Sequence, residues 1–131
     1  MFYQEVPTGL NAVFSTPHSD KVLIIAGGTA HLLDTVNYSV QGDLDDFFTY
    51  NFIRIVETCV AEEVILIASY IDIACIDKNG ILWESRFEYE ISALKVMNGT
   101  LTVNGVSAGV EEPWQMKANL KDGSIISSTG L

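Results

Sequence analysis

The segment from Glu63 to Phe87 constrains the fold more than any other part of the chain. It begins with Val64–Ala68, an apolar run rich in β-branched residues that is too short for a core helix. A second apolar stretch is followed by the dipeptide Asn79-Gly80, and another apolar run begins directly after it. Asn-Gly is typical of a tight hairpin turn because both residues tolerate a positive φ. The segment therefore predicts neighbouring antiparallel strands.

Short apolar runs and turn residues alternate along the rest of the chain as well. Three further turn dipeptides are present, at Asn98-Gly99, Asn104-Gly105 and Asp122-Gly123. No amphipathic helix of any length is indicated. The pattern predicts about ten to twelve short strands. They are expected at residues 10–14, 21–26, 31–34, 37–41, 51–60, 64–68, 71–76, 81–83, 89–93, 100–103, 114–120 and 124–127.

These strands are expected to form one all-β domain over residues 1–131. We favour a single-domain antiparallel β-sandwich or barrel built from repeated hairpins, because one open sheet would leave a face and both edges unprotected. Two alternatives stay open. The first is a set of propeller-like blades completed by oligomerisation, and the second is an α+β fold with a helix at Asp43–Tyr50.

The sequence also repeats itself weakly at a fixed offset. Val22–Gly27 falls on Val64–Ser69, and Lys78–Gly80 falls on Lys121–Gly123. The spacing is roughly 42–43 residues, which is typical of four-stranded propeller blades. Hairpins with apolar strands also look alike by chance, so a different all-β body remains compatible with the pattern.

One stretch carries a family resemblance. Residues 71–86 read IDIACIDKNGILWESR, with Asp77, Gly80 and Trp83 at fixed places. The stretch resembles the blade repeats of quinoprotein (PQQ-like) β-propellers, in which a strand ending in Asp precedes a glycine turn and a tryptophan. A chain of this length holds three such units at most, and propellers typically close with four or more blades. The resemblance therefore implies a homo-oligomer in which another subunit completes the ring.

The charge of the chain limits its possible partners. Seven basic residues oppose seventeen acidic ones, giving a formal net charge of -10 over 131 residues. Nucleic-acid binding requires a basic stripe, and the lysines and arginines here are scattered singly. Anionic membrane surfaces are disfavoured for the same reason. The balance instead suits a basic protein partner.

Two candidate sites follow from surface character. The first is an acidic and aromatic patch for a basic protein, in a non-enzymatic domain that resembles small acidic immunity or inhibitor proteins. Its expected residues are Asp43, Asp45, Asp46, Phe47, Phe48, Glu62 and Glu63. The second is a small-ligand or saccharide site, with hydrolysis as an open alternative, for which Trp83 and Trp114 would line a groove.

Motifs for other chemistry are missing from the sequence. The two histidines, His18 and His31, accompany no nucleophile elbow, and the two cysteines, Cys59 and Cys75, do not form a zinc-ligand cluster. The aspartates near residue 43 lack the glycine and glutamate of a calcium loop. We therefore expect no cofactor and no metal, and an enzymatic role is disfavoured. No secretory signal or membrane span is visible, so a cytoplasmic location is expected.

Overall fold

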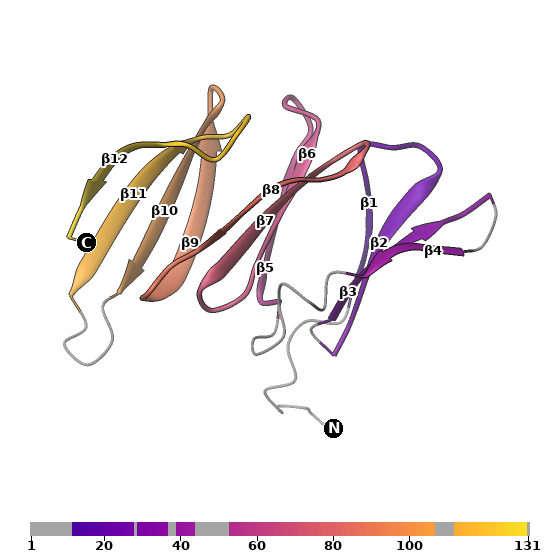
Figure 1. Cartoon of the computed structure of the whole chain (residues 1–131), viewed down its shortest axis with the longest axis horizontal. Coiled ribbons are helices and arrows are strands. Elements are labelled where there is room, and N and C mark those ends of the chain that lie inside the picture. Colours follow the sequence, from indigo (N-terminus) through magenta and orange to yellow (C-terminus); the bar gives the residue numbers. More distant parts are fainter. Residues whose placement is uncertain (1–11, 28, 37–38, 44–52, 107–111, 131) are drawn as a thin grey trace.

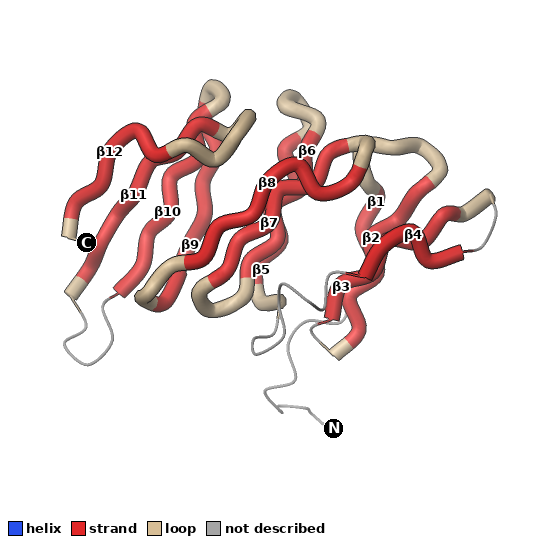
Figure 2. The backbone as a smooth tube through the Cα atoms, viewed as in Figure 1, coloured by secondary structure: helices blue, strands red, loops and turns tan. Residues whose placement is uncertain are grey.

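The computed structural model describes residues 12–27, 29–36, 39–43, 53–106 and 112–130. Within these ranges the chain contains strands and turns and no helix (Figure 2). None of the described residues belongs to a helix that is long and apolar enough to cross a bilayer. The predicted helix at Asp43–Tyr50 falls almost entirely outside the described residues, and Asp43 itself ends a strand.

The strands form three four-stranded antiparallel sheets, each joined in sequence order. We name them sheets A, B and C. Sheet A contains β1 (Ala12–Ser15), β2 (Lys21–Ala26), β3 (Thr29–Asp34) and β4 (Ser39–Asp43). Sheet B contains β5 (Ile55–Cys59), β6 (Val64–Ala68), β7 (Asp72–Asp77) and β8 (Gly80–Arg86). Sheet C contains β9 (Glu90–Met97), β10 (Thr100–Val106), β11 (Pro113–Asn119) and β12 (Ile125–Thr129).

The three sheets stand side by side, with sheet B between sheets A and C (Figure 1). The all-β, antiparallel prediction is therefore confirmed. The arrangement corresponds to the propeller-like blades that we kept as an alternative, rather than to a two-sheet sandwich or a barrel. The physical reason is that each four-stranded meander buries its apolar side chains against a neighbouring meander. The apolar faces are therefore covered without the two facing sheets of a sandwich or the closed sheet of a barrel.

Two apolar clusters hold the sheets together. One lies between sheets A and B and includes Leu23, Ile25 and Ile65. The other lies between sheets B and C and includes Leu66 and Ile73. Sheet B is thus covered on both faces, which explains why β6 is buried at every position. An uninterrupted apolar run is what a doubly covered strand requires.

The internal repetition has a structural counterpart. Val22–Gly27 covers β2 and Val64–Ser69 covers β6, and both are the second strands of their sheets. Lys78–Gly80 joins β7 to β8, and Lys121–Gly123 lies between β11 and β12. The matched residues therefore occupy equivalent places in successive sheets, as a blade repeat predicts.

One turn prediction is wrong. Asn104-Gly105 does not end a strand but continues β10, at a bulge in its pairing with β9. A Cβ atom at Gly105 would lie 2.2 Å from the Glu90 carbonyl oxygen and 2.3 Å from the Trp114 ring. The glycine is therefore present to let backbone and indole approach closely, which is a known role of glycine inside strands.

The two end faces of the assembly differ in polarity. On the outer face of sheet A, the partly exposed Ile24 pairs with Val13, which is 65% exposed, and the partly exposed Val22 pairs with Ser15. On the outer face of sheet C, Thr102 pairs with Lys95 on one side and Lys117 on the other. The outer face of sheet A therefore combines aliphatic side chains with His31, which pairs with Ile24. The outer face of sheet C is polar, as is typical of a capped end.

Candidate functional site

A cleft of about 710 Å³ opens between sheets B and C. It lies at the end of the molecule where four turns meet, those joining β5 to β6, β7 to β8, β9 to β10, and β11 to β12. Its lining residues are Glu62, Glu63, Val64, Asp77, Lys78 and Leu82 from sheet B and its turns, and Asn98, Gly99, Thr100, Asn119, Leu120, Lys121 and Ile126 from sheet C and its turns. Neither sheet alone forms this cleft.

Short-range hydrogen bonds fix the shape of the turns. The Asp77 carboxylate accepts the Asn79 backbone N–H at 2.7 Å, and the Asn119 side-chain oxygen accepts the Lys121 N–H at 2.9 Å. These are Asx turns, in which the side chain replaces a backbone acceptor. The Asp122 carboxylate accepts hydrogen bonds from both the backbone N–H and the hydroxyl of Ser124. These two bonds hold the pKa of the Asp122 carboxyl below its usual value.

Apolar side chains form the inner part of the cleft. Val64 and Leu120 are buried, whereas Leu82 and Ile126 are 41% and 60% exposed. Exposed aliphatic groups inside a concave site provide a surface on which another apolar group can pack.

Trp83 contacts the turn between β11 and β12, on the sheet C side of the cleft. Its indole N–H donates to the Leu120 carbonyl at 2.6 Å, which ties β8 to the turn before β12. The ring also leaves no room for a side chain at Gly123, where a Cβ atom would lie 2.8 Å from it. Trp83 therefore joins sheet B to the turn between β11 and β12 and does not itself line the cleft.

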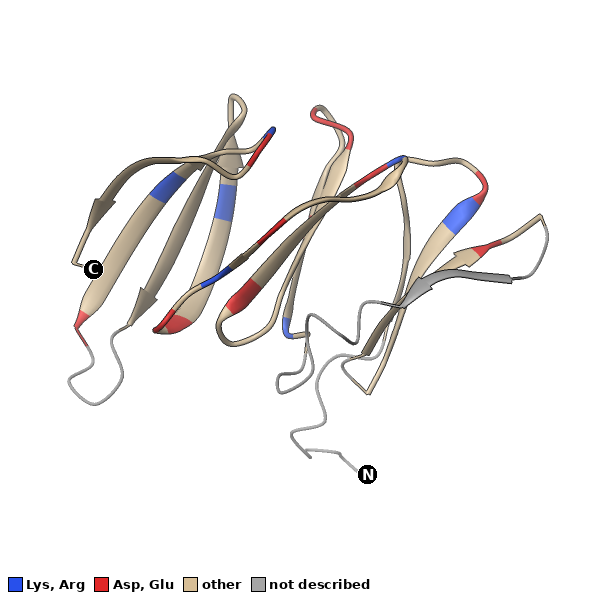
Figure 3. Ribbon diagram, viewed as in Figure 1, with Lys and Arg blue, Asp and Glu red and all other residues tan. Residues whose placement is uncertain are grey.

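The charges of the cleft are distributed unequally between its walls. All three carboxylates, of Glu62, Glu63 and Asp77, belong to sheet B and its turns. The charged residue contributed by sheet C is Lys121. Figure 3 shows the acidic turn between β5 and β6 and a turn with both colours between β11 and β12 at the same end of the molecule. Across the described residues, none of these four groups forms an ion pair.

Two residues of the cleft have an unusual backbone conformation. Glu63 has a φ of 59° and Asn98 has a φ of 53°, and they are the non-glycine residues with positive φ among those described. Asn tolerates this left-handed region, but for Glu it costs roughly 1 kcal/mol. Both residues lie in turns between antiparallel strands, where a positive φ helps to reverse the chain.

Glu63→Gly is therefore expected to raise the free energy of unfolding by about 0.5 kcal/mol, because glycine adopts a φ of 59° without the steric cost. Glu62→Gly is the matched control. Glu62 is not among the residues with positive φ, so its replacement should lower stability. Urea unfolding monitored by tryptophan fluorescence measures both. Equal destabilisation by the two changes would contradict a strained Glu63.

The cleft carboxylates also act on two buried thiols. Cys59 and Cys75 are free and buried. Burial, with the negative charges of Glu57 and Glu62, raises the pKa of Cys59 to about 11. Burial, with the neighbouring Cys59 and the charge of Asp77, raises the pKa of Cys75 to about 12. Both thiols therefore stay protonated at neutral pH and are poor nucleophiles.

Stability is expected to fall as the pH rises above about 9, where the unfolded thiols start to ionise. The folded state binds the thiol protons more tightly than the unfolded state does, so the protonated thiols contribute fully to the free energy of unfolding below pH 9. This contribution is lost as the pH rises to about 11 for Cys59 and about 12 for Cys75. Urea midpoints from pH 8 to 10.5 measure the slope. The variant with both cysteines replaced by alanine should show a flatter slope, and an identical slope would contradict the shifts.

The predicted site residues are found in different places. Glu62 and Glu63 line the cleft, whereas Trp83 does not line it and is hydrogen-bonded to Leu120, which does. Trp114 is only 2% exposed and packs against Phe87, with ring centroids 5.6 Å apart, so it belongs to the core. Asp43 ends β4 in sheet A. Asp45, Asp46, Phe47 and Phe48 lie outside the described residues.

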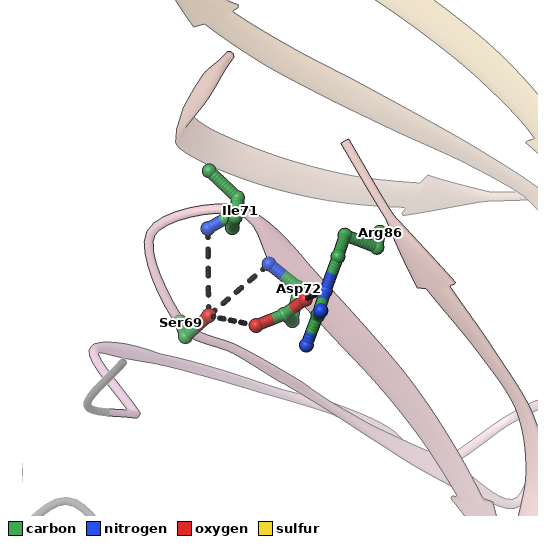
Figure 4. Close-up of polar contacts among 4 residues, drawn as sticks. All are labelled: Ser69, Ile71, Asp72 and Arg86. Carbon is green, nitrogen blue, oxygen red and sulfur yellow. Dashed lines mark hydrogen bonds and ion pairs between the residues drawn. The ribbon is translucent and has the colours of Figure 1, made fainter. Parts of the chain in front are cut away.

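A second polar cluster was not found from the sequence. Asp72 is fully buried and accepts hydrogen bonds from the Ser69 hydroxyl at 3.1 Å and the Arg86 Nε at 2.5 Å (Figure 4). The Ser69 oxygen also accepts the backbone N–H of Asp72. The cluster closes the turn from β6 to β7 and joins it to β8. An aspartate inside an apolar strand was the available signal, because Asp is depleted in strands.

Metal binding gains no support from the part of the chain that is described. No group of three His, Cys, Asp or Glu side chains there is placed to hold a metal ion.

Comparisons with known proteins identify the fold without identifying a family. The sequence matches no protein-family model, and no curated protein matches it. Among solved structures, the chain resembles hydrazine synthase from Kuenenia stuttgartiensis over 97% of its length, with a TM-score of 0.50 and 10% identity. It also resembles the WD40 domain of SCAP from fission yeast over 92% of its length, with a TM-score of 0.47 and 11% identity.

Both neighbours are propeller-like. The chain spans 50% of the hydrazine synthase chain and 34% of the SCAP chain. At this level of identity, the first likeness supports a propeller-like all-β fold and carries no information about activity. The three sheets resemble successive blades of such a fold.

Proposed function

We propose that this chain is a non-enzymatic interaction domain that binds a basic segment of a partner protein in the cleft between sheets B and C. The observation that carries the proposal is the acidic wall formed by Glu62, Glu63 and Asp77 beside the apolar side chains of Leu82 and Ile126. Carboxylates next to an aliphatic surface complement lysine and arginine, whose side chains combine a charged head with an apolar stem.

The charge of the whole chain supports the same partner. A net charge of -10 accelerates encounter with a basic protein and slows encounter with an acidic one. The cleft covers only part of one end of the molecule, so the expected affinity is in the micromolar range, on the order of that of small transient interfaces.

A titration with a lysine-containing peptide tests the proposal. The double change Glu62→Gln with Glu63→Gln is expected to weaken binding about tenfold, because both charges face the cleft. Glu84→Gln with Glu88→Gln is the matched control, since it removes the same charge at exposed positions outside the cleft lining. Equal losses from the two double changes would show general attraction and contradict a site in the cleft.

A small-ligand or saccharide site is the second candidate function. Trp83 favours it, because this half-buried indole is hydrogen-bonded to Leu120, which lines the cleft. Trp114 is buried, so it cannot serve as a second aromatic surface for a saccharide. Quenching or enhancement of Trp83 fluorescence by oligosaccharides would support this candidate, and unchanged fluorescence would count against it.

A homo-oligomer remains part of the proposal, with a second copy covering Val13, Val22 and Ile24 on the outer face of sheet A. The polar outer face of sheet C does not match this surface, so we expect face A to pack on face A and to close at two copies. Light scattering should then show a dimer that strengthens with salt, because salt screens the repulsion between two acidic chains. Ile24→Lys should give a monomer. A monomeric unsubstituted chain would contradict the dimer.

A cytoplasmic location also remains a proposal. It is supported by the two cysteines, both free thiols in this structure.

A further inference from the structure

We propose that the cleft selects an extended segment with basic side chains along one side and acidic side chains along the other. This inference rests on the proposed function and specifies the partner of the same cleft. It departs from a simple acidic patch, which would prefer the most basic segment available. The evidence is the different chemistry of the two walls.

The sheet B wall is the acidic one. Its turns bring Glu62, Glu63 and Asp77 to one side of the cleft, with Lys78 as the opposing charge. Three carboxylates against one ammonium leave a net charge of -2 on this side. Because Asp77 is also held by its hydrogen bond to the Asn79 N–H, its position does not depend on a ligand.

Among the described residues that line the sheet C wall, none carries a carboxylate. It presents Lys121 and the amide side chains of Asn98 and Asn119, all three of them exposed. An ammonium group attracts carboxylates, and side-chain amides donate to them. This wall therefore complements an acidic or carbonyl-bearing side of a ligand and repels a second row of cations.

The two walls do not neutralise each other. Neither Lys121 nor Lys78 forms an ion pair with a cleft carboxylate. The space between the walls is large enough for a segment of extended chain, at about 710 Å³. Leu82 and Ile126 provide the apolar surface for the stems of long charged side chains.

An extended chain satisfies both walls at once. Successive side chains of a β-strand point in opposite directions, so an alternating sequence directs all its basic residues to one side and all its acidic residues to the other. Lysine or arginine would then contact the sheet B wall, while glutamate or aspartate would contact Lys121 and the two amides. A segment of lysines alone would direct half its charges toward Lys121.

The experiment compares three peptides of equal length with the full chain at the same ionic strength. They contain alternating lysine and glutamate, lysine alone, or glutamate alone, and calorimetry measures their affinities. We expect the alternating peptide to bind about fivefold more tightly than the lysine peptide, and the glutamate peptide to bind most weakly.

Two substitutions, each of which removes one lysine charge from one wall, distinguish the contributions of the two walls. Lys121→Gln is expected to weaken binding of the alternating peptide about threefold and to improve binding of the lysine peptide. Lys78→Gln, on the acidic wall, should improve binding of both. If the lysine peptide binds best and both substitutions improve both peptides, the selection proposed here is wrong while the basic-segment site stands. If none of the three peptides binds, both proposals are wrong.

Discussion

Gly105→Val is expected to lower the free energy of unfolding by about 3 kcal/mol. The new Cβ atom would lie 2.2 Å from the Glu90 carbonyl oxygen and 2.3 Å from the Trp114 ring. The first neighbour is backbone and the second is a buried indole, so neither can move without separating β9 from β10 or displacing the core. Urea unfolding monitored by tryptophan fluorescence measures the loss.

Thr102→Val is the matched control for this change. Thr102 lies on the same strand, but on the partly exposed outer face of sheet C. Threonine and valine have nearly the same shape, so the free energy of unfolding should change by less than about 0.5 kcal/mol. A similar, small effect at both positions would show that Gly105 is not in close contact with Trp114.

Arg86→Met is expected to lower the free energy of unfolding by about 3 kcal/mol. Asp72 is fully buried, and the Arg86 Nε lies 2.5 Å from its carboxylate (Figure 4). Removing the cation leaves the negative charge inside the protein, where loss of one partner costs more than the net value of the pair. Chemical denaturation and thermal unfolding both measure the effect.

A double-mutant cycle separates the lost cation from lost packing. Asp72→Asn combined with Arg86→Met removes both charges, so it should be clearly more stable than Arg86→Met alone. Glu84→Met is a control for an exposed position on the same strand, and a small change is expected there. If the double variant is no more stable than Arg86→Met alone, the buried charge is not the cause.

The strands were predictable because their signals are local. Turn dipeptides at Asn79-Gly80, Asn98-Gly99 and Asp122-Gly123 all separate strands in the structure. The apolar run Val64–Ala68 is confirmed as β6 at the predicted bounds. The failure at Asn104-Gly105 has a physical reason: a glycine that makes room for a tryptophan ring has the same local sequence as a glycine that makes a turn.

The packing of the sheets was less predictable, because it depends on contacts between distant residues. A meander of apolar strands can face a second sheet or a neighbouring blade, and its sequence is similar in the two cases. The additional signal was the repeat of roughly 42–43 residues, which the equivalent positions of β2 and β6 explain.

The candidate site was predictable only in part for the same reason. Glu62 and Glu63 were identified by their charge, but the opposite wall comes from Asn98, Asn119 and Lys121, which are distant in sequence. Nothing local to those residues indicates a cleft. The Asp72 cluster had a local signal, an acid within an apolar strand, and its partner Arg86 follows on the next strand.

Backbone amide chemical shifts during addition of the alternating lysine and glutamate peptide test the central claim most directly. If the cleft between sheets B and C is the binding site, the largest shifts will occur on both walls, at Glu62, Glu63 and Asp77 on one side and at Asn98, Asn119 and Lys121 on the other. Shifts that are absent at saturating peptide, or confined to sheet A, would contradict it.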